Sequence, residues 1–403
     1  MSIPPNRYYT ERAFAALIAL LALGLGGCNR YRFPVYSADY REYAYVTDGA
    51  AGTVAVLDLV YLRQDRILQV GQQPSGLAVN PARNAVYVVN TGSDSVSVID
   101  TTQNKVTATI GVHRMPYAID VAADGKRGYV ANSGANTVSV LDLEKHRELA
   151  TAATGEQPGL ARIAPDMRSL VVTNRGSGSI SIYSVSTDVK RPLAFREAYA
   201  GCPGATDAVI LPDSSKAFVA CSGSHQVMAI WLGAAADSWR GKQDADLQQD
   251  HLLALLNVGL TPVHLALKPD GGEVFVSNFG SDSISEISTW TNEVSGSYII
   301  GSKPSRGIIS KRDNSTLWVS NFGADSITLY SIDDGKVISG VRTGAAPDAI
   351  AFSDDEHLLL VADAGTGDVA VVRTQAQNGP ELVTMLPAGQ HPNDIVTKAF
   401  KVK

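Results

Sequence analysis

The 403-residue sequence carries little charge and has no concentration of positive charge. Asp, Glu, Lys and Arg make up 18% of the residues, and 34 basic against 40 acidic residues leave a formal net charge of −6. Globular proteins usually have a charged fraction of ~25%. Because nucleic-acid binding depends on clustered Lys and Arg, this distribution argues against a nucleic-acid partner.

Several motifs of enzymes and cofactor proteins are absent. The sequence has no C-x-x-C-H for covalent haem, no G-x-x-x-x-G-K for nucleotide phosphates and no G-x-S-x-G nucleophile turn. It also has no pair of His at a local metal spacing such as H-x-x-x-H. We therefore assign no catalytic residue or metal ligand from the sequence, and no cofactor is expected.

Long apolar runs are absent apart from one near the N-terminus. Residues Ala13 to Leu25 are uncharged and follow Arg7 and Arg12. Thirteen helical residues at 1.5 Å each fall short of the ~30 Å bilayer core, so a permanent spanning helix is not expected. A charged start, a short apolar stretch and small residues are typical of a secretory signal.

The apolar run ends in Leu25-Gly26-Gly27-Cys28, which resembles the lipobox of bacterial lipoproteins. The resemblance implies cleavage after residue 27 and acylation of Cys28. Asn29, in place of the Asp that retains such proteins in the inner membrane, implies transport to the outer membrane. We expect residues 28–42 to form a tether and 43–403 the folded domain. The alternative is an ordinary signal peptide with an incidental Cys.

One pattern recurs along the rest of the chain. An aromatic or aliphatic residue, Val and a small residue precede an Asn or Asp, which we call the anchor. Seven of the eight anchor positions have Gly two residues later, and all have Val or Ile six residues later. The eight positions, most of them 42 or 43 residues apart, are Asp48, Asn90, Asn132, Asn174, Cys221, Asn278, Asn321 and Asp363.

A second landmark, a G-x-x-P turn, stands about 16 residues before most anchors. Regular copies include Gly71/Pro74 and Gly389/Pro392, while Gly111/Pro116 is interpreted as two residues longer and Gly201/Pro203 as one shorter. Each unit then contains four short segments with strand patterns. Four strands every ~42 residues predict an all-β fold, a β-propeller.

These motifs, such as YVVN ending at Asn90 and FVSN ending at Asn278, resemble the YVTN-family β-propeller repeat of bacterial and archaeal surface proteins. The resemblance covers roughly residues 43–398 and implies a propeller fold. It says little about activity, because propellers host many functions.

The ends of the repeat array predict how the ring closes. Only 11 residues follow Pro392, and no G-x-x-P turn precedes Asp48. We expect residues 393–398 to supply the innermost strand of the blade that begins near Tyr43, which removes two exposed sheet edges. This gives eight blades, with seven as the alternative because family members are more often seven-bladed.

The other two cysteines, Cys202 and Cys221, flank a predicted hairpin whose turn lies midway between them. In an oxidising compartment they are expected to form a disulfide that takes over the role of the missing anchor Asn. Unlinked thiols or a redox-active pair are the alternatives. At the other anchors, we expect the Asn or Asp side chain to cap its own turn rather than bind a ligand.

Strand order places the G-x-x-P turns and the anchors on one face, around the mouth of a central channel. Polar residues that break the repeat there could bind an anionic group or a metal, and otherwise they are solvated loop residues. These candidates are His113, Arg114, His264, Lys303, Arg306, Asp348, His391 and Asp394.

The longest insertion covers residues 234–257. Leu247, His251, Leu252 and Leu255 have helical spacing, so a short amphipathic helix is expected. It could cover its own blade or dock on a partner.

We expect a monomeric, non-enzymatic binding or scaffolding propeller of the cell envelope, tethered to the outer membrane, with an envelope protein or a glycan as partner. Two alternatives remain open. Lactonase and cyclase propellers are similar in repeat style. The haem domain of cytochrome cd-type nitrite reductases is also eight-bladed, and this resemblance implies an axial His from among His113, His264 and His391.

Overall fold

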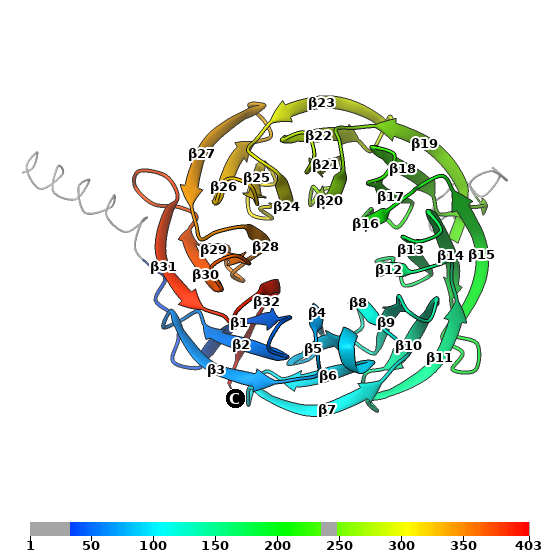
Figure 1. The fold of residues 1–403 in the computed structure, drawn as a ribbon, viewed down its shortest axis with the longest axis horizontal. Helices are drawn as coiled ribbons and strands as arrows, with labels where there is room; N and C mark the ends of the chain where they lie inside the picture. The colour runs from blue at the N-terminus through cyan, green and yellow to red at the C-terminus, as the bar shows by residue number, and fades with distance from the viewer. Residues whose placement is uncertain (1–32, 235–247, 403) are drawn as a thin grey trace, which may run out of the picture.

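The computed structural model describes residues 33–234 and 248–402. They form eight four-stranded antiparallel sheets that surround a central axis like the blades of a propeller (Figure 1). The predicted all-β, eight-bladed ring is thus confirmed over the seven-bladed alternative. Within the described ranges, no helix combines the length and the apolar character needed to cross a bilayer.

Each blade runs outward from the central channel. The first four blades, innermost strand first, are β32 (Pro392–Lys401), β1 (Tyr40–Asp48), β2 (Thr53–Asp58), β3 (Arg63–Gln69); β4 (Pro74–Val79), β5 (Ala85–Asn90), β6 (Ser95–Asp100), β7 (Lys105–Gly111); β8 (Pro116–Val121), β9 (Arg127–Asn132), β10 (Thr137–Asp142), β11 (Arg147–Ala153); β12 (Pro158–Ile163), β13 (Ser169–Asn174), β14 (Ser179–Val185), β15 (Leu193–Ala200). A short 3-10 helix, η1 (Thr91–Ser93), follows β5.

The other four blades follow the same order. They are β16 (Ala205–Ile210), β17 (Lys216–Cys221), β18 (Gln226–Trp231), β19 (His251–Asn257); β20 (Pro262–Leu267), β21 (Glu273–Asn278), β22 (Ser283–Ser288), β23 (Glu293–Ile299); β24 (Pro304–Ile309), β25 (Thr316–Asn321), β26 (Ser326–Ser331), β27 (Lys336–Arg342); β28 (Pro347–Phe352), β29 (Leu358–Asp363), β30 (Asp368–Arg373), β31 (Glu381–Pro387).

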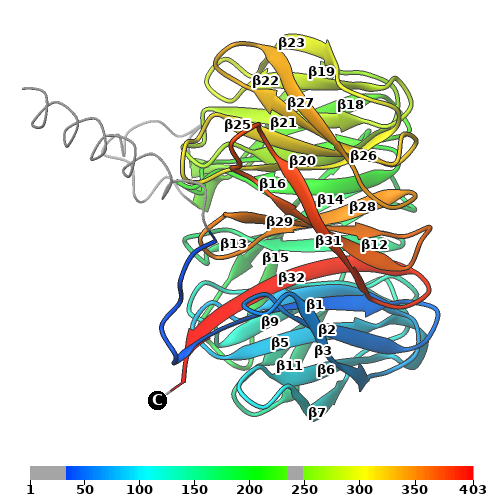
Figure 2. The ribbon, with the colours of Figure 1, turned by 90° about the vertical axis from the view of Figure 1, so that its left-hand side faces the viewer.

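The two ends of the chain close the ring, as the sequence predicts. β32 pairs antiparallel with β1, with Tyr45 opposite Val396 and Val46 opposite Ile395 (Figure 2). β1 begins at Tyr40, three residues before the predicted start. Closure gives β1 a partner on its inner edge and β32 a partner on its outer edge.

Both faces of each blade are buried, which explains the run of two apolar residues in the repeat. Tyr45 packs with Val86 and Val88 of the next blade, while its neighbour Val46 packs with Leu360 of the preceding one. Successive side chains of a strand point to opposite faces, so a strand between two blades needs apolar residues at consecutive positions.

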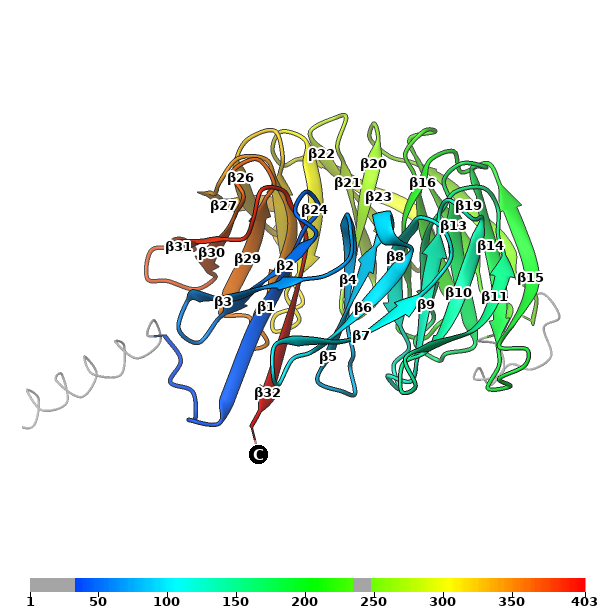
Figure 3. The ribbon, with the colours of Figure 1, turned by 60° about the horizontal axis from the view of Figure 1, so that its bottom comes forward.

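The innermost strands all begin on the same face, which we call the upper face, and end on the opposite, lower face. The G-x-x-P turns and the anchors lie on the upper face. The C-terminal end of β32 and the start of β1 lie on the lower face (Figure 3).

The expectation that the anchor Asn caps its own turn is wrong, because its side chain bonds to neighbouring strands instead. Asn90 Oδ1 instead accepts the N–H of Gly71, at 3.0 Å, and its Nδ2 donates to the hydroxyls of Ser95 and Ser97. The Nδ2-to-hydroxyl bond recurs for Asn132–Ser139, Asn174–Ser181, Asn278–Ser285 and Asn321–Thr328. The anchor is structural, as expected, but it links neighbouring strands.

The three anchor positions without Asn also lack a hydroxyl seven residues later. They pair Asp48 with Ala55, Cys221 with Met228 and Asp363 with Ala370. A carboxylate has no proton to donate, so it needs no acceptor at that position. Asp48 does cap its own turn: its carboxylate accepts backbone N–H groups from Ala50 and Ala51, and also from Gln390 and His391.

Asp363 should make the protein less stable as the pH rises. It is fully buried, and burial outweighs the weak contacts of its carboxylate with the Gly344 N–H and the Thr343 hydroxyl and raises its pKa to about 7. The unfolded value is about 3.9, so the folded state holds the proton more tightly and stability falls as the pH rises from about 4 to 7. Asp363→Asn combined with Ala370→Ser should remove this loss, worth about 4 kcal/mol at most.

Urea unfolding at pH 5 and pH 8 checks this expectation. The double variant should gain stability over the wild type at pH 8 much more than at pH 5. The matched control is Asp48→Asn, which should not gain stability, because Asp48 already accepts backbone hydrogen bonds. An equal pH dependence in the wild type and the double variant would contradict the assignment.

The predicted disulfide between Cys202 and Cys221 is present, and both residues are fully buried. Ala205 pairs with Cys221 just as Pro74 pairs with Asn90. Cys202 therefore stands where Gly71 stands, three residues before its strand, and no turn is shortened at Gly201/Pro203. The covalent bond replaces the link between Asn90 and Gly71.

The predicted helix in the insertion is wrong for residues 251–257, which form the outer strand β19. A bulge sets Ala229 opposite Ala254 and Ile230 opposite Leu252. The bulge leaves Leu252 and Leu255 exposed on one side, three residues apart, which imitates helical spacing. Residues 235–247, including Leu247, lie outside the described residues.

Candidate functional site: the upper channel mouth

A ring of hydrogen bonds joins the eight innermost strands around the channel. In each neighbouring pair, a side chain of one strand bonds to the backbone of the other. In ring order the side chains and their backbone partners are Asp394–Leu77, Ser75–Tyr117, Asp120–Ile163, Arg162–Ala208, Asp207–Leu265, His264–Gly307, Ser305–Pro347 and Thr397–Phe352. Part of the polar content of the channel is therefore structural.

Three carboxylates of this ring share one geometry. In Asp120, Asp207 and Asp394, one oxygen accepts the N–H of the following residue and the other accepts an N–H of the next blade. Burial raises the pKa of Asp120 and Asp394. Burial also acts on Asp207, but the Arg162 guanidinium and the Leu265 N–H are among the neighbours that outweigh it and lower its pKa.

A cavity of about 330 Å³ opens at the upper end of the channel. Aromatic and arginine side chains dominate its wall, together with two acids. The charged and aromatic residues are Tyr117, Arg162, Arg175, Asp207, Phe279, Arg306, Phe322 and Asp348. We call this cavity the mouth pocket.

Arg306 brings to the mouth pocket a guanidinium that makes a long ion pair but no hydrogen bond within the described chain. Its Nε lies 3.7 Å from Asp348 Oδ1, longer than a hydrogen bond. Burial lowers its pKa, but Asp348, Asp394 and Asp207 outweigh burial and raise it, so the group stays charged. Five N–H donors at the side of a channel can bind an anion in a forked geometry.

Asp207, Arg162 and His264 form a second cluster beside Arg306. Arg162 lies 3.5 Å and His264 Nε2 3.7 Å from the Asp207 carboxylate. His264 Nδ1 accepts the Gly307 N–H, so its proton resides on Nε2, facing Asp207. Burial lowers the pKa of His264 to about 4, which makes the imidazole neutral at pH 7. The lone pair of Nδ1 is taken up by the Gly307 N–H, so the neutral imidazole has none free with which to act as a general base.

Aromatic rings and cations form the rim of the mouth pocket. The Arg175 guanidinium lies 4.0 Å from the centre of the Tyr117 ring, and its buried Nε has no partner among the described residues. Phe279 and Phe322 have ring centroids 5.9 Å apart, and Lys303 Nζ lies 5.8 Å from the Phe279 centroid. The rim thus combines apolar faces with positive charge.

The structure brings together half of the predicted mouth residues. His264, Arg306, Asp348 and Asp394 line or adjoin the channel. The exposed His113, Arg114 and His391 lie outside it: His113 Nε2 contacts Thr151, Arg114 donates to Gly134 O and His391 Nδ1 contacts Ala364 O. Lys303 reaches the mouth pocket only from above, at Phe279.

The expected longer turn at Gly111/Pro116 is also absent. Pro116 pairs with Asn132 as Pro74 pairs with Asn90, so His113 occupies the position of Gly71. The turn has ordinary length, and the His side chain points toward the outer strand, where it contacts Thr151 of β11.

The sequence analysis missed six of the charged and aromatic residues of the mouth pocket: Tyr117, Arg162, Arg175, Asp207, Phe279 and Phe322. A positional signal could have found two of them. The second and fourth residues after the Pro position of the inner strand point into the channel. The second position holds Asp207, His264, Arg306 and Asp394, and the fourth holds Asp120 and Arg162. Among the described residues, no group of three or more His, Cys, Asp or Glu is placed to hold a metal.

Comparison with known proteins gives a propeller but no single activity. A family model described as "Lactonase, 7-bladed beta-propeller" matches residues 301–385. A search of curated proteins finds no match to the sequence. Solved structures with a similar fold include dihydro-haem d1 dehydrogenase NirN, which is 17% identical, with 91% of this chain and 76% of that chain covered and a TM-score of 0.70.

Two further similar structures come from other functional classes. Hydrazine synthase of Kuenenia stuttgartiensis is 20% identical, with 83% of this chain and 92% of that chain covered and a TM-score of 0.55. A putative 6-phosphogluconolactonase of Bacteroides fragilis is 15% identical, with 91% and 100% covered and a TM-score of 0.57. At these identities the likeness concerns the fold.

The NirN neighbour raises the question whether the channel fits a haem. His264 accepts the Gly307 N–H at Nδ1 and has Nε2 3.7 Å from the Asp207 carboxylate, and His113 and His391 lie outside the channel. The three candidate His therefore do not fit axial ligation of an iron in the mouth pocket.

Proposed function

We propose that the protein is a lipid-anchored binding module of the cell envelope, and that its mouth pocket holds an anionic group of an envelope glycan. The observation that carries the proposal is Arg306, a charged guanidinium without a described hydrogen bond in a concave pocket. Arg162 and Arg175 add positive charge to the same wall.

The aromatic residues favour a sugar acid over a small inorganic anion. Tyr117, Phe279 and Phe322 offer ring faces on which the apolar side of a sugar ring can stack. A carboxylate on that ring would reach a guanidinium as a charge-assisted pair. The ligand class is thus a uronic acid or a similar acidic sugar, with an acidic protein segment as the competing partner.

Arg306→Gln should weaken binding of oligogalacturonate at least ten-fold, because a hydrogen bond to a charged group contributes about 1.5–3 kcal/mol. Calorimetric titration of residues 28–403 measures the change. The matched control is Arg342→Gln, which removes the same charge from an exposed position at the end of outer strand β27 and should leave the affinity unchanged. Equal affinities of the two variants, or binding of a Glu-rich peptide alone, would contradict the proposal.

The envelope location rests on the sequence, since Cys28 lies outside the described residues. Its test is labelling of cells with an alkyne fatty acid. The wild-type protein should take up the label and the Cys28→Ser variant should not.

Lactone hydrolysis is a second candidate, favoured by the family match to residues 301–385. Asp207, His264 and Arg306 are the polar residues that such an activity would use. The bond from the Gly307 N–H to His264 Nδ1 speaks against His264 as the base of such a reaction, because it occupies the lone pair of the imidazole. Turnover of 6-phosphogluconolactone that is lost in His264→Gln would establish this activity instead.

A further inference from the structure

The described N-terminal segment, residues 33–39, is fastened to the lower face. Tyr36 donates a hydrogen bond to Asp355 Oδ2 at 2.9 Å, and its ring stacks on Tyr40 with centroids 4.5 Å apart. Phe33 packs edge-on against His357, and the Arg373 guanidinium lies 5.0 Å from the Phe33 centroid. We call Phe33 and Tyr36, with their partners on the turn between β28 and β29, the clamp.

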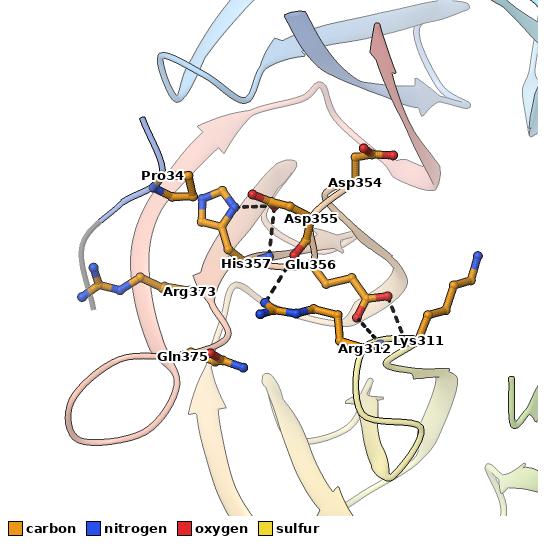
Figure 4. Close-up of a pocket in the computed structure, with 9 residues that line it drawn as sticks. All are labelled: Pro34, Lys311, Arg312, Asp354, Asp355, Glu356, His357, Arg373 and Gln375. Carbon is orange, nitrogen blue, oxygen red and sulfur yellow. Dashed lines mark hydrogen bonds and ion pairs between the residues drawn. The ribbon is translucent and has the colours of Figure 1, made fainter. Parts of the chain in front are cut away.

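Hydrogen bonds within the protein hold the receiving turn rigid. His357 Nδ1 bonds to Asp355 Oδ1 (Figure 4). The Ser353 hydroxyl donates to the same oxygen. Glu42 accepts the N–H of Asp354 and the hydroxyl of Tyr40, which ties β1 to the same turn. The clamp therefore docks on a preformed surface.

The clamp shortens the free part of the chain. Phe33 is five positions after Cys28, a length of chain that can span at most about 18 Å. Tyr40 is twelve positions after Cys28, a length that could span about 43 Å. With the clamp closed, an anchor at Cys28 must lie close to the lower face. The mouth pocket is then held farther away by about 20 Å, the length of a six-residue strand.

The lower face also carries side chains suited to a lipid surface. Trp290, at the turn between β22 and β23, is 82% exposed, and Tyr61, at the turn between β2 and β3, is 66% exposed. Trp and Tyr favour the interface between lipid and water. Beside Pro34, a cavity of about 600 Å³ includes the exposed Lys311 and Arg312, which can pair with lipid phosphates, and also the acids Asp354, Asp355 and Glu356 (Figure 4).

From these observations we infer that the clamp lays the lower face on the bilayer, so that the mouth pocket opens away from the membrane and takes its ligand from the aqueous side. The inference rests on the proposed acylation of Cys28. It adds an orientation and a partner surface, the lipid headgroups.

The test replaces natural acylation by a chemical bond between Cys28 and a phospholipid. Residues 28–403 are coupled through Cys28 to a maleimide phospholipid in phosphatidylethanolamine and phosphatidylglycerol vesicles, since Cys202 and Cys221 are already bonded to each other. Energy transfer to dansyl-labelled headgroups then compares two Trp positions. One is the native Trp290 on the lower face, and the other is Leu260→Trp on the upper face in a Trp290→Phe background.

Transfer from position 290 should clearly exceed transfer from position 260, each taken relative to Trp290→Phe. The double variant Phe33→Ser and Tyr36→Ser should bring the two values together, because the longer free chain lets the propeller turn. The control Phe195→Ser, on outer strand β15, should keep them apart. Equal transfer from both positions with the clamp intact would overturn the inference. Solution titration of the mouth pocket would be unaffected, so failure here is distinct from failure of the proposed binding or of natural acylation.

Discussion

A chain that ends at Ala388 should fail to form a cooperatively folded propeller. It lacks β32, so the nine-residue strand β1 loses its inner neighbour. Ile395 is lost from the core between the first and last blades. The hydrogen bonds from Asp394 to Leu77 and from Thr397 to Phe352 are lost as well. The free energy lost with this strand pairing, packing and hydrogen bonding is comparable with the 5–15 kcal/mol of net stability of a typical domain.

Two companion experiments separate closure from mere shortening. A chain ending at Lys401 loses the bond between Val402 N–H and Asp39 O but keeps β32, and it should unfold as the wild type does. A peptide of residues 389–403, added to the short chain, should restore a cooperative urea transition by pairing with β1. A short chain that unfolds like the wild type would show that β32 does not close the ring.

Replacing both Cys202 and Cys221 by Ser should lower the free energy of unfolding by about 3 kcal/mol. The bond closes a loop with a sequence separation of 19 residues, and the chain-entropy model gives about this value. Urea unfolding without reductant measures the loss. A change below about 1 kcal/mol would mean that the bond constrains little.

The repeat itself supplies a repair for this loss. Cys202→Gly, Cys221→Asn and Met228→Ser together copy the arrangement of Gly71, Asn90 and Ser97, in which the Asn bonds both partners. This triple variant should be more stable than the Ser pair, by about 1–2 kcal/mol for the restored hydrogen bonds. If it is no more stable, Cys202 and Cys221 do not stand in for the Gly and Asn of the other blades.

The repeat made the architecture predictable, because each unit repeats its own strand and turn signals. The same two landmarks left the first unit without its inner strand and the C-terminal end with an inner strand alone, which predicted the pairing of β32 with β1. The disulfide followed from a hairpin that places Cys202 and Cys221 side by side.

The sequence-based expectations that proved wrong depended on contacts between residues of different strands, which a local sequence pattern does not show. Asn90 bonds Gly71, 19 residues earlier, rather than its own turn. The bulge in β19 changed the spacing of exposed Leu from two to three and imitated a helix. In the site, residues inside the turns, such as His113, lie outside the channel, while residues two and four positions into the inner strand point into it.

The candidate site consists of exceptions to the repeat. At the second position after the Pro, several blades carry small or apolar residues, whereas Asp207, His264, Arg306 and Asp394 supply charge or a ring nitrogen. Three of these four spend hydrogen bonds on neighbouring blades, and Arg306 does not. The scaffold therefore leaves Arg306 available to a ligand.

The most direct test of this account removes the charge from Arg306 and from the ligand carboxylate in turn. Oligogalacturonate and its methyl ester are titrated into the wild type and into Arg306→Gln. If Arg306 binds the carboxylate, the substitution weakens binding of the acid at least ten-fold and leaves the weaker binding of the ester unchanged. Equal losses for acid and ester, or no loss for either, would show that the mouth pocket does not use Arg306 to hold an anion.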